Sequence, residues 1–77
     1  MKKDWRERIV IDEEILSGKP VIKNTRISVE FILELLGNGW TYEQVLDNYP
    51  QLRRGDIEAA LRYAAEVLQD ELVYPYP

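Results

Sequence analysis

Residues 18–29 read Gly-Lys-Pro-Val-Ile-Lys-Asn-Thr-Arg-Ile-Ser-Val and contain two extended fragments joined by a polar turn. Residues 20–22 and 25–27 supply the β-branched side chains that strands favour. Between them, Lys23 and Asn24 form a two-residue connection in which asparagine accepts a positive φ. We therefore predict a β-hairpin here. Strands this short are marginal alone in water, so the ribbon must lie on helices or pair with a second chain.

Two further segments are predicted upstream of this hairpin. Residues 8–12 form a β-branched run between charged side chains and are interpreted as a strand, and residues 13–18 are interpreted as a single turn that glycine ends. Charged side chains interrupt residues 1–8, where a signal peptide would need an apolar run. We expect residues 1–8 to be a flexible N-terminal segment, Trp5 to be either an anchor for a partner or disordered, and the protein to be cytoplasmic.

Two helices with clear start signals are predicted after the hairpin. The first covers residues 29–36, with Ser28 as its N-cap and a Gly-Asn-Gly sequence after it. The second begins at Thr41, whose hydroxyl caps the first turn while Gln44, three residues later, completes a capping box. Pro50 stops this second helix, because proline cannot continue it.

A third helix is predicted over residues 54–71, and its start is poorly marked because Arg53 is a weak N-cap and Gly55 lowers helix propensity. Two apolar stripes run along this helix. The first stripe, expected in the core, consists of Ile57, Ala60, Leu61, Ala64 and Leu68. The second stripe consists of Ala59, Tyr63 and Val67. Because a small domain needs only one stripe for its core, the second predicts an additional contact surface. The alternative is that this stripe packs under the β-ribbon and that the C-terminal tail is disordered.

The composition argues against catalysis and metal binding. The chain contains no histidine and no cysteine, so it has no imidazole for acid–base chemistry and no thiolate ligand or nucleophile. Its carboxylates in residues 12–14 and 70–71 are adjacent in sequence, as in a solvated charged surface, and are not spaced to converge on an ion. We expect a protein that is not an enzyme, holds no metal or cofactor, and has no membrane span.

Charge is distributed unevenly along what we expect to be one domain, at residues 9–72, followed by an extended tail at residues 73–77. Residues 1–26 hold seven basic and five acidic side chains, whereas residues 27–77 hold three basic and nine acidic ones. An acidic surface repels phosphate backbones and favours a basic protein partner. The charge distribution therefore favours protein binding over DNA binding.

Residues 18–29 closely resemble the G-K-P-V-I-x-G-T-R-I-x-V signature of the domain of unknown function 433 family. Further stretches match that family's pattern in the same order, and the resemblance covers residues 8–68. These stretches are Gly39-Trp40, Tyr49-Pro50-x-Leu52 and Asp56-Ile57-x-Ala59-Ala60-Leu61-x-Tyr63-Ala64. An ordered match of this length is specific, whereas any one of its pieces alone would be weak.

The resemblance implies a mainly α fold: a three-helix, homeodomain-like helix-turn-helix with a short N-terminal β-hairpin. It also implies an antitoxin-like protein, often a homodimer, encoded beside a nuclease-like toxin of the PIN-related type. Two residues depart from the family pattern. Asn24 stands where relatives carry glycine, which a turn tolerates because asparagine also accepts positive φ. Arg53 stands where relatives carry a capping threonine.

The motif residues are interpreted first as local structure. For Arg26 we favour an ion pair with Glu30 or Glu34 that would hold the ribbon on the first helix, and the alternative is binding of a phosphate or of a partner's carboxylate. The motif set is Gly18, Lys19, Pro20, Thr25 and Arg26.

Two functional hypotheses follow. We rank first an antitoxin-like module that binds and neutralises a neighbouring nuclease-like toxin, with autoregulatory DNA binding as an addition. The alternative is a helix-turn-helix transcriptional regulator without a toxin partner. The expected partner-binding residues are Ala59, Tyr63, Val67, Tyr74 and Tyr76. The expected contacts to operator DNA are Arg53, Arg54, Glu58 and Arg62. A homodimer through the ribbon at residues 9–27 is expected in either case.

Overall fold

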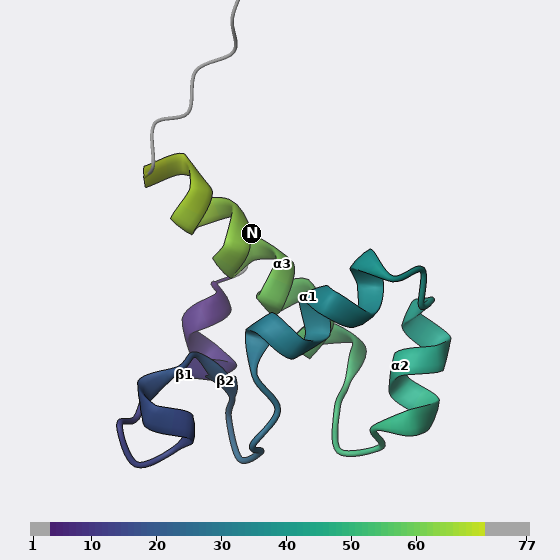
Figure 1. The fold of residues 1–77 in the computed structure, drawn as a ribbon, viewed down its shortest axis with the longest axis horizontal. Helices are drawn as coiled ribbons and strands as arrows, with labels where there is room; N and C mark the ends of the chain where they lie inside the picture. The colour runs from purple at the N-terminus through teal and green to yellow at the C-terminus, as the bar shows by residue number, and fades with distance from the viewer. Residues whose placement is uncertain (1–3, 71–77) are drawn as a thin grey trace, which may run out of the picture.

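Three α-helices and a two-stranded sheet make up residues 4–70, the part of the chain that this computed structural model describes (Figure 1). The mainly α fold with an N-terminal β-hairpin is therefore confirmed. Two single-turn 3-10 helices, η1 and η2, lie near the N-terminus. The elements are η1 (Trp5–Glu7), β1 (Ile9–Val10), η2 (Leu16–Gly18), β2 (Val21–Ile22), α1 (Val29–Gly37), α2 (Tyr42–Asn48) and α3 (Arg54–Asp70).

The sheet pairs β1 with β2 in antiparallel register, with Ile9 opposite Ile22 and Val10 opposite Val21. The strand predicted at residues 8–12 is thus present in a shorter form. It occupies the edge of β2 and buries Ile9 and Ile22 against the helices. The ribbon therefore lies on the helical core, as its short strands require.

The second strand of the predicted hairpin, at residues 25–27, does not form. A single bridge joins Val21 to Ser28, and the Ile22 N–H donates to the Ile27 carbonyl over 2.9 Å. The pairing stops there because Ser28 already caps α1, so the chain turns away into the helix. The predicted turn at Lys23 and Asn24 is present: the Thr25 N–H donates to the Ile22 carbonyl over 3.0 Å, and Asn24 takes the expected positive φ of 66°.

Residues 13–18 also differ from the helical turn that we predicted. Leu16, Ser17 and Gly18 have φ angles of 50°, 58° and 86°, so the turn at η2 is left-handed. Glycine enters such a conformation without a steric penalty, whereas leucine and serine do so at a cost of roughly 1–2 kcal/mol each. The sequence pattern predicts the position of the turn in this segment correctly, but it does not predict that the turn is left-handed.

The predicted helix caps are present. The Ser28 hydroxyl accepts the Phe31 N–H over 2.9 Å at the start of α1. In α2, Thr41 and Gln44 form the capping box with bonds of 3.1 and 2.8 Å. At the end of α1, Gly39 has a φ of 95°, which ends the helix in the left-handed conformation.

The core lies where β2, α1, α2 and the first half of α3 meet. The largest fully buried side chains are Ile22, Ile32, Ile57, Val21 and Val45. In α3 the inner stripe was correct for its first part, at Ile57 and Ala60, and wrong beyond it, because Leu61 and Leu68 are 40% and 62% exposed. The nine residues of α1 span about 13 Å and the 17 residues of α3 about 25 Å, so α3 extends past the core.

A buried carboxylate, which the sequence did not suggest, caps the start of α3. Asp56 is only 6% exposed, and its Oδ2 accepts the backbone N–H of Arg53 over 2.8 Å. Its Oδ1 accepts from Nη1 of Arg8 over 3.0 Å, which ties α3 to the residue before β1. The weak N-cap at Arg53 is thus compensated by the side chain three residues later.

Residues 5–7 of the N-terminal segment form η1, and the flexibility that we expect for residues 1–8 stays a prediction. Residues 1–3 lie outside the described part of the chain. Trp5 packs edge-on against Tyr63 of α3, with 4.8 Å between the ring centroids. This contact and the Arg8–Asp56 ion pair hold η1 on α3.

We expect Asp56→Asn to lower the free energy of unfolding by about 2 kcal/mol, because hydrogen bonds to a charged group contribute about 1.5–3 kcal/mol. The matched control is Glu30→Gln, which removes the exposed Lys19–Glu30 pair and should cost less than about 0.5 kcal/mol. Urea titration of both variants measures the difference. Equal losses would mean that the buried carboxylate contributes no more than a surface ion pair.

Gly55 faces the Arg8 guanidinium, whose atoms would lie 2.6–2.9 Å from an added Cβ. We expect Gly55→Ala to destabilise the protein by displacing Arg8 from Asp56, although alanine favours a helix by about 1 kcal/mol over glycine. In an Arg8→Ala background the same substitution should stabilise instead. Gly37→Ala, with open space around it, is the control. Thermal unfolding of this cycle gives the sign, and additive effects would contradict the proposed contact.

Candidate partner-binding groove

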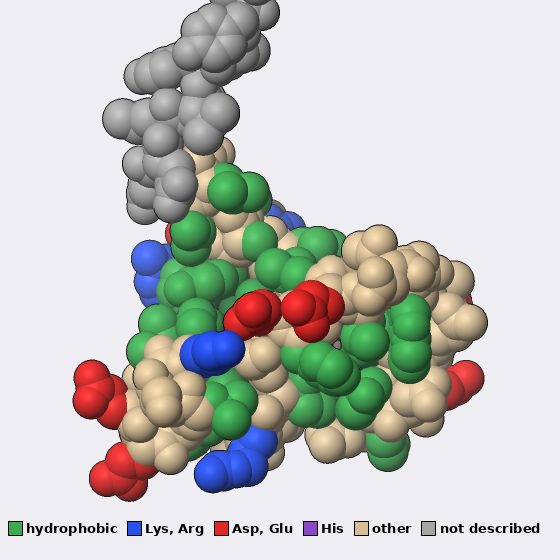
Figure 2. Space-filling view, viewed as in Figure 1, with side chains coloured by type: hydrophobic (Ala, Val, Ile, Leu, Met, Phe, Trp, Pro, Cys, Tyr) green, Lys and Arg blue, Asp and Glu red, His purple; other side chains and the backbone are tan. Residues whose placement is uncertain are grey.

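An apolar groove of about 580 Å³ lies between α1 and the C-terminal half of α3. Figure 2 shows hydrophobic side chains gathered on this face of the molecule, with acidic side chains beside them. Its apolar lining is Pro20, Val29, Leu33, Tyr63, Ala64, Val67 and Leu68. The groove forms because α3 continues beyond the buried core and leaves this part of its apolar surface uncovered.

Two lining residues belong to the second stripe that the sequence predicted on the third helix. Tyr63 is half-buried, and its ring is oriented by the edge-on contact with Trp5. Val67, one turn later, is 39% exposed. Ala59, the third member of the stripe, is only 4% exposed and lies in the core, so it is not accessible to a partner. The stripe passes from buried to exposed along α3 because the helices of the core cover only the first half of α3.

Two carboxylates of α1 give the groove its charge. Glu30 and Glu34 both line it and lie one helical turn apart, so they share a face of α1. Lys19 donates to Glu30 over 3.1 Å, and both side chains are more than half exposed. Among the described residues Glu34 has no ion pair. The rim therefore offers at least one free carboxylate next to an apolar surface, a combination suited to a segment with both apolar and basic side chains.

Arg26 does not make the ion pair with α1 that we favoured. It is exposed, and Lys19 takes the Glu30 carboxylate instead. The other motif residues shape the backbone: the Thr25 hydroxyl donates to the Ile22 carbonyl and accepts the Ile27 N–H. The Pro20 carbonyl accepts the Val29 N–H over 2.9 Å. The motif thus positions the start of α1, on which the groove depends.

The expected DNA-contact residues lie just before α3 and on its first half, and none of them lines the groove. Arg53, Arg54 and Arg62 are exposed and Glu58 is half-buried. The Arg54 guanidinium lies 4.7 Å from the centroid of the Tyr42 ring, so a cation–π contact orients it. DNA binding by these residues stays a prediction. Tyr74 and Tyr76 lie outside the described residues.

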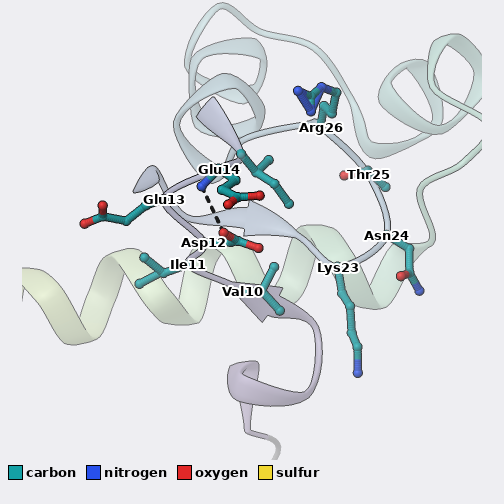
Figure 3. Close-up of a pocket in the computed structure, with 10 residues that line it drawn as sticks. Val10, Ile11, Asp12, Glu13, Glu14, Lys23, Asn24, Thr25 and Arg26 are labelled. Atoms are coloured by element: carbon teal, nitrogen blue, oxygen red, sulfur yellow. Dashed lines mark hydrogen bonds between the residues drawn. The ribbon is translucent and has the colours of Figure 1, made fainter. Parts of the chain in front are cut away.

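A second, broader depression of about 1030 Å³ lies beside the ribbon (Figure 3). Acidic residues 12–14 lie on one side of it and the turn at residues 23–26, with Lys23 and Arg26, on the other. Ile11, on the acidic side, is 58% exposed. The two sides thus carry opposite charge beside an apolar residue, an arrangement that a copy of the same surface could complement.

The groove and the depression are open surfaces that combine apolar and charged side chains. Within residues 4–70 no group of three metal-ligating side chains converges. No helix among these residues is long and apolar enough to cross a membrane. From the sequence, Glu30 and Glu34 are expected only as partners of Arg26 and not as partner-binding residues, although their spacing of four residues on a predicted helix places them on one face.

These features define a small, mainly α-helical domain with an N-terminal β-hairpin and an exposed apolar groove. A model of the family described as protein of unknown function (DUF433) matches residues 9–64, so the chain belongs to the DUF433 family. The crystal structure of a DUF433 member protein from Anabaena variabilis superposes with a TM-score of 0.76 at 30% sequence identity. The match covers 82% of this chain and 62% of that protein. A comparison with curated proteins finds no match.

Proposed function

We propose that the protein is an antitoxin-like interaction module whose groove between α1 and α3 binds a basic, nuclease-like partner encoded beside it. The observation that carries this proposal is an exposed apolar groove with Glu30 and Glu34 at its rim. The resemblance of residues 18–29 to antitoxin-like proteins supports the same partner class. A cationic surface that binds nucleic acid in the partner would complement these carboxylates.

The size of the groove limits what it can achieve alone. Each apolar side chain that a partner buries there contributes about 1.5–3 kcal/mol, while association costs at least about 4 kcal/mol in lost rigid-body freedom. Specific interfaces bury roughly 800 Å² on each partner, which is more than one short groove provides. Tight neutralisation therefore requires either contacts outside the groove or two grooves in a dimer.

We expect Val67→Asp and Glu34→Lys to abolish both neutralisation of the neighbouring nuclease-like protein and co-purification with it. Val67→Asp introduces a carboxylate that a bound partner would bury away from water, and Glu34→Lys reverses the charge at the rim of the groove. Matched controls outside the groove are Leu61→Asp, on the exposed side of α3, and Glu43→Lys, on α2. Growth during co-expression and affinity pull-down are the measurements.

The possible outcomes distinguish an error in the proposed antitoxin function from an error in the choice of binding surface. A neighbouring protein that is neither toxic nor bound would contradict the antitoxin function itself. Binding that resists both groove variants while responding to the controls would place the contact elsewhere on the molecule and contradict the groove assignment.

We also propose that two copies associate through the depression beside the ribbon. In a two-fold dimer, if one residue of the first copy contacts a second residue of its partner, the same contact occurs again with the two copies exchanged. The acidic residues 12–14 of one copy would then face Lys23 and Arg26 of the second, with the exposed Ile11 of each copy buried in the contact. Within residues 4–70 of one chain, no ion pair joins the two sides.

Ile11→Lys should convert this dimer to a monomer, because it places a charge at the centre of the interface. Leu61→Lys, an equally drastic change at an exposed leucine on α3, should leave the dimer intact. Light scattering at about 10–100 μM, well above the dissociation constant of a stable dimer, measures the mass. A monomeric wild-type chain at that concentration would overturn the proposal.

A further inference from the structure

We propose that a polar pocket formed by Arg8, Lys23 and Arg53 binds a phosphate group. The pocket has a volume of about 370 Å³, at the lower end of the range for small-molecule sites. It lies where the turn after β2 meets the start of α3. Three cationic side chains from three separate segments of the chain line it. None of its lining residues belongs to the groove between α1 and α3, so this inference is independent of the proposed partner binding.

Arg8 is a preorganised member of this site. Its Nη1 is fixed by Asp56 over 3.0 Å, and the guanidinium packs against the backbone at Gly55. Asp56 is engaged through both oxygens, since Oδ2 accepts the Arg53 N–H. The Asp56 carboxylate thus fixes the position of the Arg8 guanidinium at the pocket. The planar guanidinium has several N–H donors in a fixed arrangement that matches two oxygens of a phosphate.

Lys23 and Arg53 supply two further cations. Both are exposed, and neither forms an ion pair with another residue of the described chain. Both line the pocket together with Asn24 and Gln51, whose amide side chains can also donate. The Thr25 hydroxyl, in contrast, is already used within the turn.

Charge favours an anion in this pocket. Its lining contains three cationic side chains against the carboxylates of Glu7 and Asp56, which leaves a net charge of +1. The start of α3 adds the partial positive charge of a helix N-terminus. A phosphate dianion or diester therefore has several donors and little repulsion, whereas a single carboxylate would leave donors unused. The phosphate can belong to a free phosphate ester or to a nucleic-acid backbone.

Amide chemical shifts during titration with inorganic phosphate test the site. We expect saturable shifts at residues 23–25 and 51–54, with a dissociation constant in the millimolar range, and at least a fivefold weakening in Lys23→Gln with Arg53→Gln. Arg26→Gln is the matched control, because Arg26 lies in the same turn and lines the neighbouring depression but not the pocket. Uniform, non-saturable shifts, or equal weakening by the control, would overturn the proposal.

Duplex DNA of arbitrary sequence identifies the source of the phosphate. If DNA binds in fluorescence anisotropy, weakens with salt, and weakens further in Lys23→Gln with Arg53→Gln, the pocket takes a nucleic-acid phosphate. If inorganic phosphate binds saturably and DNA does not, the pocket takes a free phosphate ester. Absence of both would overturn the phosphate assignment, while co-purification of the groove partner would be unaffected.

Discussion

The buried carboxylate of Asp56 is the interaction on which the arrangement of this small domain depends. One of its oxygens accepts the backbone N–H of Arg53, the residue before α3, and the other binds Arg8, 48 residues earlier in the chain. Burying a carboxylate is costly unless it is paired and hydrogen-bonded, and here both conditions are met. The same contact therefore starts the longest helix and fixes the position of β1 against it. Gly55 is required beside it, because a Cβ there would occupy the space of the Arg8 guanidinium.

Local features of the fold could be predicted from the sequence, and features that join distant segments could not. The caps at Ser28 and at Thr41 with Gln44 were correct because donor and acceptor lie three residues apart, within one helical turn. The Arg8–Asp56 pair had no such signal, since nothing in the spacing of two charged residues shows that they meet. The choice of strand partner was wrong for a related reason, because residues 8–12 and 25–27 both suited the edge of β2.

The groove could be predicted in part, because one of its walls is a local feature of a single helix. Helical periodicity identified Tyr63 and Val67 as a stripe separate from the core, and both line the groove. Periodicity gives the face of a helix but not the point at which its neighbours end. Ala59 is buried and Leu68 is exposed because α1 covers only the first half of α3, a consequence of their lengths and crossing. The pairing of Lys19 with Glu30 likewise depends on how the ribbon meets α1.

The second half of α3 has less support than the first, and this affects any binding in the groove. Among the described residues, the buried core of α3 ends at Ala60, and Tyr63 on Trp5 is the aromatic contact beyond it. A helical segment of about ten residues is marginal in water without tertiary packing. A partner seated against Val67 and Leu68 would replace that missing packing. Part of its binding energy then goes into holding the helix, so affinity depends on the stability of α3 as well as on the contacts made. The Trp5–Tyr63 contact lowers this cost because it supports α3 beside the groove before any partner arrives.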